Sequence, residues 1–179
     1  MRFPCATRLV ILTQSKENAE NILKVVLKWA NENELTIHPE KTHIGDYRVE
    51  GQGFDFLGYR FENGTRWIRK KSILKFLDKI RENTRRTCGN SISKVIEKIN
   101  PILKGWYNYF KHVTKWTLGT FDSFVRRRLR SILRRQNKKS KGTGRNTHDH
   151  KHWPNKFFAK LGLFTMENAR SLEVACRSR

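Results

Sequence analysis

The sequence predicts an α+β fold that is mostly α: a small strand–helix–strand–β-hairpin region followed by a basic helical bundle. Apolar residues recur at helical spacing through most of residues 71–136. Asn63 and Gly64 separate two runs rich in apolar and aromatic residues, which is a strong hairpin signal. The positive charge is concentrated in the part predicted to be helical, so the two regions also differ in chemistry.

The charge is strongly uneven. The 179 residues carry a net charge of +22. Residues 1–65 contain 8 Lys or Arg and 9 Asp or Glu, whereas residues 66–145 contain 24 and 4. Such an excess destabilises a compact state unless an anionic partner neutralises it, and nucleic acid is the partner it most often implies. An anionic membrane surface is the alternative, but no stretch approaches the roughly 20 apolar residues that span a bilayer. We therefore expect no membrane partner.

The cysteines indicate the compartment. Cys5, Cys88 and Cys176 are odd in number and widely spaced, which favours reduced thiols over a disulfide framework. The first twelve residues lack the apolar length and the cleavage-like end of a secretory signal. The sequence thus predicts a cytoplasmic protein.

Residues 1–68 are predicted to form the first domain. Residues 9–13 predict a short buried strand, and Ser15 is a plausible N-cap for an amphipathic helix over 16–33. Residues 35–42 alternate at first like a strand, which Pro39 confines to an edge or an end. The Asn-Gly hairpin completes the region.

Residues 69–136 are predicted to form a helical domain. One helix is expected at 71–86, a second after Ser91, and a third at 118–136. Pro101 interrupts the apolar stripe of the second helix, and an interior proline costs about 3 kcal/mol, so a kink or a new helix start is expected there. Residues 137–152 have no apolar residue and predict a flexible basic loop, and a short helix starts near Met166. Residues 137–179 are assigned to a basic loop and C-terminal extension.

The third basic helix predicts a phosphate-binding surface. Arg126, Arg130 and Arg134 recur every four residues and so form one row, with Arg127 beside it. Arginine forks bind phosphate bidentately, and few acidic residues are near enough in sequence to pair with this row. Basic side chains on the first helix of this domain add to the surface: Lys70, Lys71, Lys75 and Lys79.

The stretch Ile99–Lys111, INPILKGWYNYFK, combines aromatic and basic residues. Its aromatics can hold a core or stack on bases. Trp106 and Phe110 lie on the apolar stripe and are predicted to be core. Tyr107 and Tyr109 lie off the stripe and are candidates for stacking on bases. Lys104 and Lys111 are predicted to lie nearer the nucleic acid.

No catalytic or metal-binding pattern accompanies these residues. His148, His150 and His152 alternate, but no Cys or carboxylate at zinc-ligand spacing joins them, so a phosphate-facing or solvated loop is the favoured interpretation. The sequence shows no Ser/His/Asp or Cys/His arrangement and no Gly-rich phosphate loop.

Four segments in series resemble the C-terminal half of group II intron reverse transcriptases, the intron-encoded maturases: LTIHPEKTHI, FDFLGYRF, INPILKGWYNYFK and FDSFVRRRLRSILRR. The resemblance extends from about Leu9 to the end of the chain. It implies that residues 9–68 are the end of a polymerase palm and 69–136 a thumb, or maturase X domain. The implied partner is structured intron RNA, with an RNA/DNA duplex as a further one, and the implied role is assistance in RNA folding and splicing.

The resemblance also assigns roles to individual residues. Lys41, in HPEKT, matches a palm motif that assists nucleotide addition. The segment FLGY matches the hairpin that grips the primer end, and it comprises Phe56, Leu57, Gly58 and Tyr59.

One departure decides the expected chemistry. Where the family has Tyr-x-Asp-Asp, this chain has Cys5, Ala6, Thr7 and Arg8. Two Mg²⁺ ions need carboxylates to hold them, and the rest of the palm and the fingers would precede Met1. We expect no catalytic residues, no polymerisation by this chain alone and no cofactor on its own, although intact family enzymes use Mg²⁺.

Three interpretations remain open from the sequence. The leading one is an RNA-binding fragment of a group II intron reverse transcriptase with residual maturase function. The second is one subunit of a split RNA-directed DNA polymerase that another chain completes, which Thr7 and Arg8 disfavour. The third is a decayed fragment without function, because a partial palm exposes sheet edges and apolar faces. A cooperative melting transition separates the first from the third.

Overall fold

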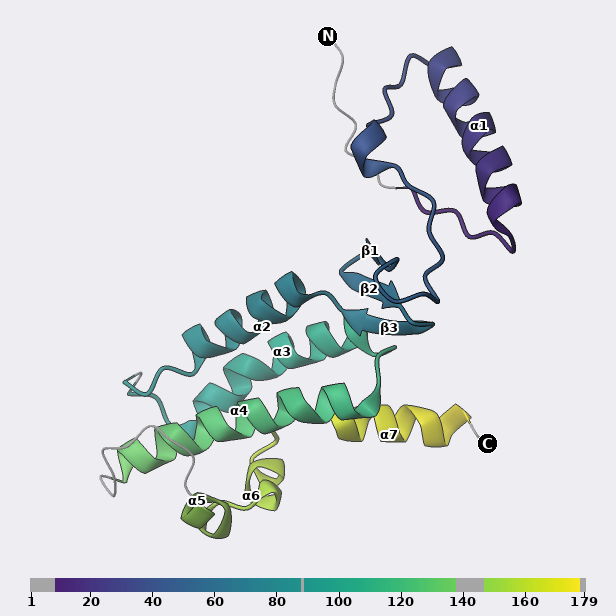
Figure 1. The fold of residues 1–179 in the computed structure, drawn as a ribbon. Coiled ribbons are helices and arrows are strands. Elements are labelled where there is room, and N and C mark those ends of the chain that lie inside the picture. The colour runs from purple at the N-terminus through teal and green to yellow at the C-terminus, as the bar shows by residue number, and fades with distance from the viewer. Residues whose placement is uncertain (1–8, 88, 138–146, 178–179) are drawn as a thin grey trace. The chain divides into compact units, whose positions relative to one another are not determined.

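The computed structural model describes residues 9–87, 89–137 and 147–177. The chain divides into two compact units, Met1–Arg69 and Lys70–Arg179, which we call the first unit and the helical unit. Small antiparallel strands occur in the first unit and helices make up the second, which confirms the predicted mostly-α α+β fold class (Figure 1).

The first unit contains one long helix and a three-stranded antiparallel sheet in the order β1-β2-β3. Ser15 caps the helix as predicted, because its Oγ accepts a hydrogen bond from the Asn18 backbone N–H at 3.2 Å. A short 3-10 helix, η1, precedes the sheet. The elements are α1 (Lys16–Glu32), η1 (Pro39–Lys41), β1 (Phe54–Phe56), β2 (Tyr59–Glu62) and β3 (Thr65–Ile68).

Two-residue turns join the three strands. Asn63 and Gly64 have φ of 52° and 65°, which fits a type I′ turn and confirms the predicted hairpin. Leu57 and Gly58 form the other turn, with φ of 44° and 79°. A bulky side chain rarely adopts the left-handed conformation, so Leu57 is an outlier in this fold.

Two predicted strands are wrong. Residues 9–13 form no strand, and Leu9 and Leu12 are 68% and 74% exposed. Residues 35–38 are also irregular and lead into η1. Among the described residues the only sheet is the one over 54–68, which does not extend to either segment. Both segments have strand-like sequences, but they pair with no strand of the described residues, and a strand needs a paired neighbour for its backbone hydrogen bonds.

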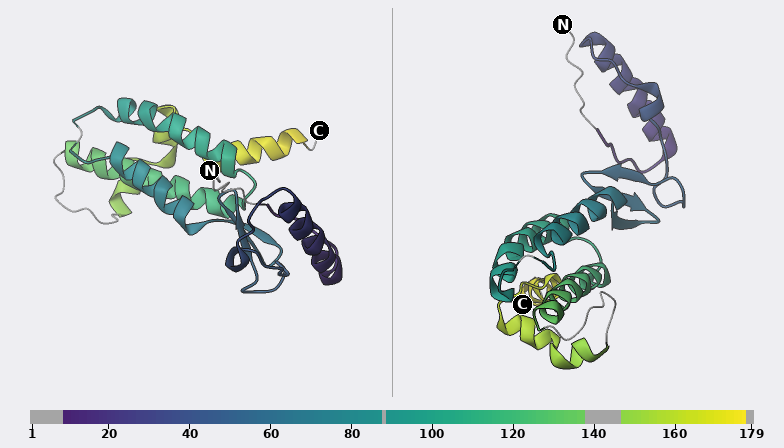
Figure 2. Two further views of the ribbon diagram at one scale, coloured as in Figure 1. Left: turned by 90° about the horizontal axis from the view of Figure 1, so that it is seen from above. Right: turned by 90° about the vertical axis from the view of Figure 1, so that its left-hand side faces the viewer.

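The helical unit is built on three long helices. α3 lies beside both α2 and α4, and α7 contacts α3 and α4 (Figures 1 and 2). Ser91 caps α3 as predicted, and Thr114 caps α4. The three predicted helices are confirmed to within a few residues. The elements are α2 (Lys70–Asn83), α3 (Ile92–Phe110), α4 (Lys115–Gln136), α5 (Thr147–His152), α6 (Asn155–Lys160) and α7 (Met166–Arg177).

The sequence predicts either a kink or a new helix start at Pro101. α3 continues through Pro101, so of these two alternatives the new helix start is wrong. The proline removes one backbone donor at a cost of about 3 kcal/mol. Ile99 and Leu103 flank it, and both are fully buried. Burying two such side chains recovers an amount of the same order, which explains why the helix continues.

The core of the helical unit joins α2, α3 and α4 through an aromatic cluster. The ring centroids of Phe76 and Trp106 lie 4.4 Å apart, and those of Trp106 and Phe121 lie 4.7 Å apart. Fully buried aliphatic side chains surround this cluster, among them Ile80, Ile96, Ile99, Leu103, Leu118, Leu129 and Ile132. These residues recur along one face of each helix, so the three helices bury a continuous apolar face, as the predicted periodicity requires.

The C-terminal segment, residues 147–177, is fixed to the bundle by polar side chains. Asp122 accepts hydrogen bonds from the backbone N–H groups of Met166 and Glu167, at 3.0 and 2.9 Å, where α7 begins. Asn100 donates to the Gly162 carbonyl at 2.8 Å and accepts from the Phe164 N–H at 2.9 Å. Burial raises the pKa of Asp122, and the two N–H donors oppose this rise. The carboxylate therefore acts as a buried cap for α7.

Residues 147–152, part of the predicted loop, form α5. The remainder of that loop over 138–146 lies outside the described residues, as do Cys5, Ala6, Thr7 and Arg8. None of the described helices is both long enough and apolar enough to cross a membrane.

Candidate nucleic-acid interface

The lysines of α2 form an exposed basic row. Lys71, Lys75 and Lys79 are four residues apart, which places them on one face at steps of about 6 Å along the helix. Lys70 precedes them, and all four side chains are exposed. Within the described part of the chain, none of the four takes part in an ion pair. They are available to an anionic partner.

Arg128 has a structural role. Its guanidinium donates to Thr84 Oγ1 at 3.0 Å, to the Thr84 carbonyl at 2.8 Å and to the Arg81 carbonyl at 3.3 Å. Burial lowers the pKa of Arg128, and the neighbouring guanidinium groups of Arg81, Arg127 and Arg86 lower it further. It satisfies carbonyls at the end of α2 and thereby holds α4 against it.

Arg130 is buried at 4% exposure, against the prediction that it belongs to an open phosphate-binding row. Its Nε donates to the Trp153 carbonyl at 2.9 Å and its Nη2 to Asn155 Oδ1 at 2.8 Å. The guanidinium also lies 5.2 Å above the Phe158 ring. Burial lowers the pKa of Arg130; Arg126 adds to this and Asp149 opposes it. The C-terminal segment covers this position.

Arg134, like Arg130, is buried, against the prediction that it belongs to an open phosphate-binding row. It is 5% exposed, and its Nη2 lies 2.9 Å from Asp149 Oδ2, whose side chain is also buried. The sequence suggested that few acids were near enough to pair, and the partner Asp149 comes from α5, fifteen residues further along. The predicted single row is therefore wrong for Arg130 and Arg134.

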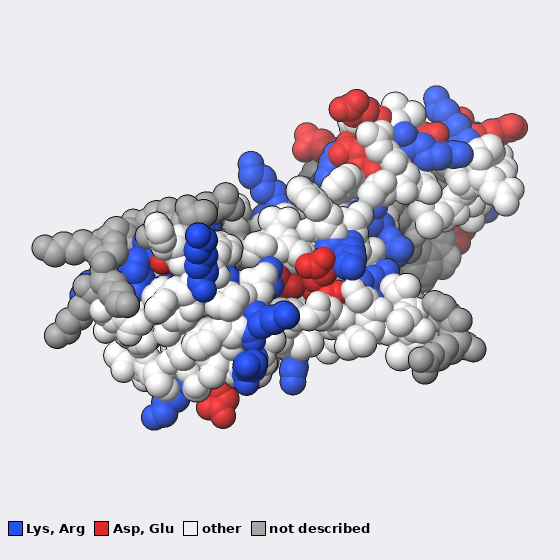
Figure 3. Space-filling view, turned by 90° about the horizontal axis from the view of Figure 1, so that it is seen from below, with Lys and Arg blue, Asp and Glu red and all other residues white. Residues whose placement is uncertain are grey.

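The outward side of α4 keeps three arginines. Arg126 is half-buried and donates to Ser123 Oγ at 3.3 Å. Arg127 is exposed, and its guanidinium lies 5.4 Å from the centre of the Phe124 ring. Arg135 is exposed near the end of the helix. On the face drawn in Figure 3, separate Lys and Arg side chains project from the left and centre of the view, with uncharged surface and, at the centre, acidic side chains between them.

The aromatics of α3 divide differently from the prediction. Phe110 is buried and Trp106 packs in the aromatic cluster, as expected for core positions. Tyr107, predicted to stack on bases, is only 3% exposed, and its ring lies 5.8 Å from that of Phe164. Its assignment to an open surface is wrong because the C-terminal segment packs over that side of α3. Tyr109 is 52% exposed and stays a stacking candidate.

The two lysines of this stretch also differ. Lys104 is exposed on α3. Lys111 is half-buried, and its Nζ lies 3.2 Å from Glu173 Oε1 on α7. This ion pair reduces the charge that Lys111 can offer to a nucleic acid.

The candidate residues of the first unit lie on loops and turns. Lys41 ends η1 and is exposed. Phe56 and Tyr59 pair at the end of the β1–β2 hairpin, and Leu57 and Gly58 form its turn. Leu57 projects into solvent with 65% of its side chain exposed. The predicted primer-grip segment is thus a tight hairpin tip.

The structure adds residues that the sequence did not single out. Trp116 is 78% exposed at the start of α4. Its sequence neighbour Lys115 lines a pocket together with Arg170. A cation next to a tryptophan, as in Lys115-Trp116, could have been noticed in the sequence. Arg170 is 55 residues further along, and only the folded structure brings it to the same pocket. No group of three or more metal-ligating side chains occurs within the described ranges.

These features define a class of domain: a basic helical bundle whose inner arginines fix its C-terminal segment and whose outer cations are open. Residues 73–153 match the family model described as the group II intron, maturase-specific domain. This range covers α3, α4 and α5 and most of α2. The match supports a relation between the helical unit and group II intron maturases. The comparison with curated proteins gave no match.

Proposed function

We propose that this chain is an RNA-binding protein of the group II intron maturase type, which binds structured intron RNA through its helical unit and assists splicing. One observation carries the proposal: the segment that matches the maturase-specific domain, residues 73–153, lies in the part of the chain with most of the positive charge. RNA neutralises such a surface and releases counterions, which makes binding strong at low salt.

The described side chains suggest which cations make the contact. Lys71, Lys75 and Lys79 on α2, with Arg127 and Arg135 on α4, are exposed. The inward arginines of α4 hold the fold, so their part in binding is indirect. The proposed surface is therefore made mainly of lysines, which act as point charges towards phosphates.

The proposal excludes polymerisation by this chain alone. Thr7 and Arg8 stand where the resemblance places two aspartates, and a guanidinium beside a metal site repels Mg²⁺. The resemblance of residues 9–68 to a palm, with Lys41 and FLGY, leads us to propose an RNA/DNA duplex as a second ligand of the same protein.

Filter binding to a group II intron RNA and to an unrelated structured RNA of equal length, over a salt series, tests the proposal. We expect tighter binding to the intron RNA at every salt concentration and a steep decline with salt. Equal affinities for the two RNAs would contradict the proposal and leave a general polyanion binder.

A matched pair of variants locates the surface. Lys71→Ala/Lys75→Ala removes two exposed lysines four residues apart on α2, and Lys24→Ala/Lys28→Ala does the same on α1. We expect the α2 variant to lower the salt slope by about one for each phosphate that is no longer neutralised, and the α1 variant to leave the slope unchanged. Equal slopes in the two variants would place the surface elsewhere.

The exposed apolar surface of the first unit favours a second candidate, a subunit of a split RNA-directed DNA polymerase. Val25 and Trp29 on α1 are 68% and 56% exposed, which suits contact with another polypeptide. Primer extension that appears only when a second chain is added would support this candidate over the first.

A further inference from the structure

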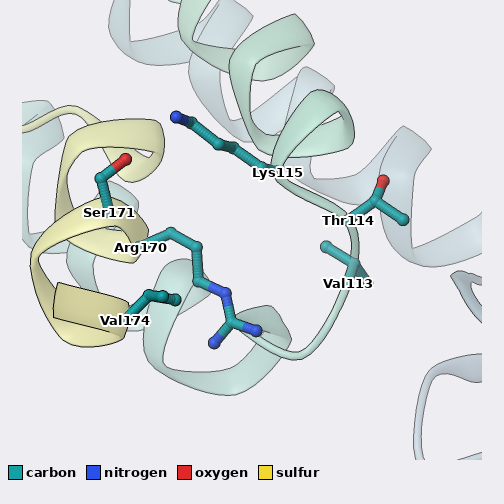
Figure 4. Close-up of a pocket in the computed structure, with 6 residues that line it drawn as sticks. All are labelled: Val113, Thr114, Lys115, Arg170, Ser171 and Val174. Atoms are coloured by element: carbon teal, nitrogen blue, oxygen red, sulfur yellow. The ribbon is translucent and has the colours of Figure 1, made fainter. Parts of the chain in front are cut away.

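A pocket lies between the α3–α4 connection and α7, on the helical unit. Its volume is about 430 Å³, within the range of small-ligand sites. Figure 4 shows Lys115 reaching from the start of α4 towards α7, and Arg170 reaching from α7 across the pocket towards the connection. The full lining comprises Val113, Thr114, Lys115, Arg170, Ser171 and Val174.

The two cations of the pocket are not neutralised within the described part of the chain. Neither Lys115 nor Arg170 takes part in an ion pair there. Glu173, the acid on the next turn of α7, is held by Lys111 at 3.2 Å. Glu167 lies three residues before Arg170 but does not pair with it. Two cations that line one pocket and are not neutralised by an acid of the described residues favour an anion with several acceptor oxygens, as a phosphate has.

An exposed tryptophan directly follows the pocket residue Lys115 in the sequence. Trp116 follows Lys115 in the first turn of α4, and at 78% exposure it is the most exposed large hydrophobic side chain among the described residues. Its carbonyl accepts from Thr120 Oγ1 at 3.1 Å, so the backbone there is in regular helix. No aromatic ring of the described residues contacts the indole. A large aromatic face left open next to cations is the arrangement that binds nucleic-acid bases by stacking.

We propose that Trp116, Lys115 and Arg170 form a binding site for an unpaired nucleotide of RNA. The base stacks on the Trp116 indole, and Lys115 and Arg170 hold an adjoining phosphate. Ser171 Oγ donates to the Glu167 carbonyl at 3.0 Å, which leaves its lone pairs to accept from a ribose hydroxyl.

The exposed Trp116 indole favours an unpaired nucleotide over other anions as the ligand. A free phosphate would use the two cations and leave Trp116 without a role. In a duplex both faces of each base are covered by neighbouring bases, so an unpaired base is the one that offers a face. The inference rests on the proposed function, because it takes RNA as the partner, and it adds a preference for unpaired over paired segments.

The experiment measures the affinity of the full-length protein for two RNAs: a uridine oligomer of about ten nucleotides and a perfect RNA duplex of the same length. We expect Trp116→Ala to weaken binding of the oligomer about tenfold and to change duplex binding by less than about twofold, because stacking is removed and charge is kept. Trp116→Phe keeps a ring and should recover most of the oligomer affinity. Trp29→Ala, a tryptophan 56% exposed on α1, is the matched control and should change neither affinity.

Lys115→Ala/Arg170→Ala tests the other half of the site. We expect a lower affinity for the oligomer and a lower salt slope. Lys115 is exposed and Arg170 is half-buried, and neither pairs with an acid of the described residues, so the melting temperature should stay close to that of the wild type; it is measured for each variant.

The outcomes separate the two proposals. If the wild type does not bind the group II intron RNA of the filter-binding assay, the proposed function fails. If it binds that RNA but not the oligomer, or if Trp116→Ala leaves the ratio of oligomer to duplex affinity unchanged, this inference fails and the proposed function stands. A loss of affinity in Trp29→Ala as large as in Trp116→Ala would also overturn the inference.

Discussion

The two units bury their apolar residues to very different extents. Among the described residues, Ala30 and Ile68 are the only buried apolar side chains of the first unit, whereas the helical unit holds the remainder of the core. Leu9, Leu12 and Val25 in the first unit are each at least 68% exposed. The unit with the large positive charge is thus also the better packed, and part of that charge lies on inward arginines that make hydrogen bonds or an ion pair within the fold.

Adjacent arginines on α4 show the same contrast within one helix. Arg134 is paired with Asp149 inside the fold, and Arg135 is exposed. The side chains are chemically identical, but Arg134 lies on the side of α4 that meets Asp149, and Arg135, one residue on, lies on another side. In this protein a count of arginines overstates the positive surface that is open to an anionic partner.

A core substitution should sharpen the comparison between the units most strongly. Leu103→Ala removes a fully buried side chain from α3 and should lower the free energy of unfolding by about 2–5 kcal/mol. Leu27→Ala, on α1 with the leucine 40% exposed, should cost less than about 1 kcal/mol. Urea unfolding followed by circular dichroism measures both. Similar costs would show that the first unit is packed as well as the helical unit.

Breaking the buried ion pair should have the next largest effect. Arg134→Ala leaves the Asp149 carboxylate buried and unpaired, which should cost about 3 kcal/mol. Arg135→Ala, one residue further and exposed, should change stability by less than about 0.5 kcal/mol. Thermal unfolding of the two variants measures the difference. If both variants melt together, the pair does not hold α5 to α4.

The cap of α7 should contribute less. Asp122→Asn offers one acceptor where two backbone N–H groups need one each, so we expect a loss of about 1–3 kcal/mol. Asp78→Asn, at an exposed site on α2, is the control. Faster amide hydrogen exchange at Met166 and Glu167 would show that α7 loosens. Unchanged exchange at these two amides would contradict the assigned role.

The same carboxyl group predicts a pH dependence. Burial raises the pKa of Asp122 in the folded state above its ordinary value of about 3.9. Its protonated form is therefore favoured by folding, and the resulting stability is present in full below the ordinary pKa and is lost as pH rises through the raised pKa. The Asn variant should lack this loss when unfolding is measured across the same pH range.

Local signals were sufficient for part of this fold. The helical periodicity and Ser91 located α2, α3 and α4, and the Asn63-Gly64 pair located a hairpin, because each depends on residues close in sequence. The predicted strands over 9–13 and 35–38 failed because a strand depends on a partner that the local sequence does not reveal.

The candidate site was less predictable for a related reason. Tyr107 and Arg130 were assigned to an open surface because their own helices leave them outside the apolar stripe. Phe164 and Trp153 cover them, from 57 and 23 residues away. Lys71 and Arg127 were identified correctly as exposed, since nothing in the described C-terminal segment packs on them. Long-range packing, which periodicity does not encode, divides the two groups.

The smallest effect is expected at the hairpin tip of the first unit, and its sign is opposite to the others. Leu57 adopts φ of 44° while 65% exposed, so it bears left-handed strain of about 1 kcal/mol and gains little from burial. Leu57→Asn should stabilise the hairpin by about 0.5–1 kcal/mol, seen as slower amide exchange over residues 54–68, because asparagine tolerates this conformation in a type I′ turn. If the exposed leucine serves the nucleic acid, affinity for an RNA/DNA duplex should fall in the same variant. Stabilisation without loss of affinity would remove the hairpin tip from the interface and leave binding to the helical unit, which sharpens the division between the two units.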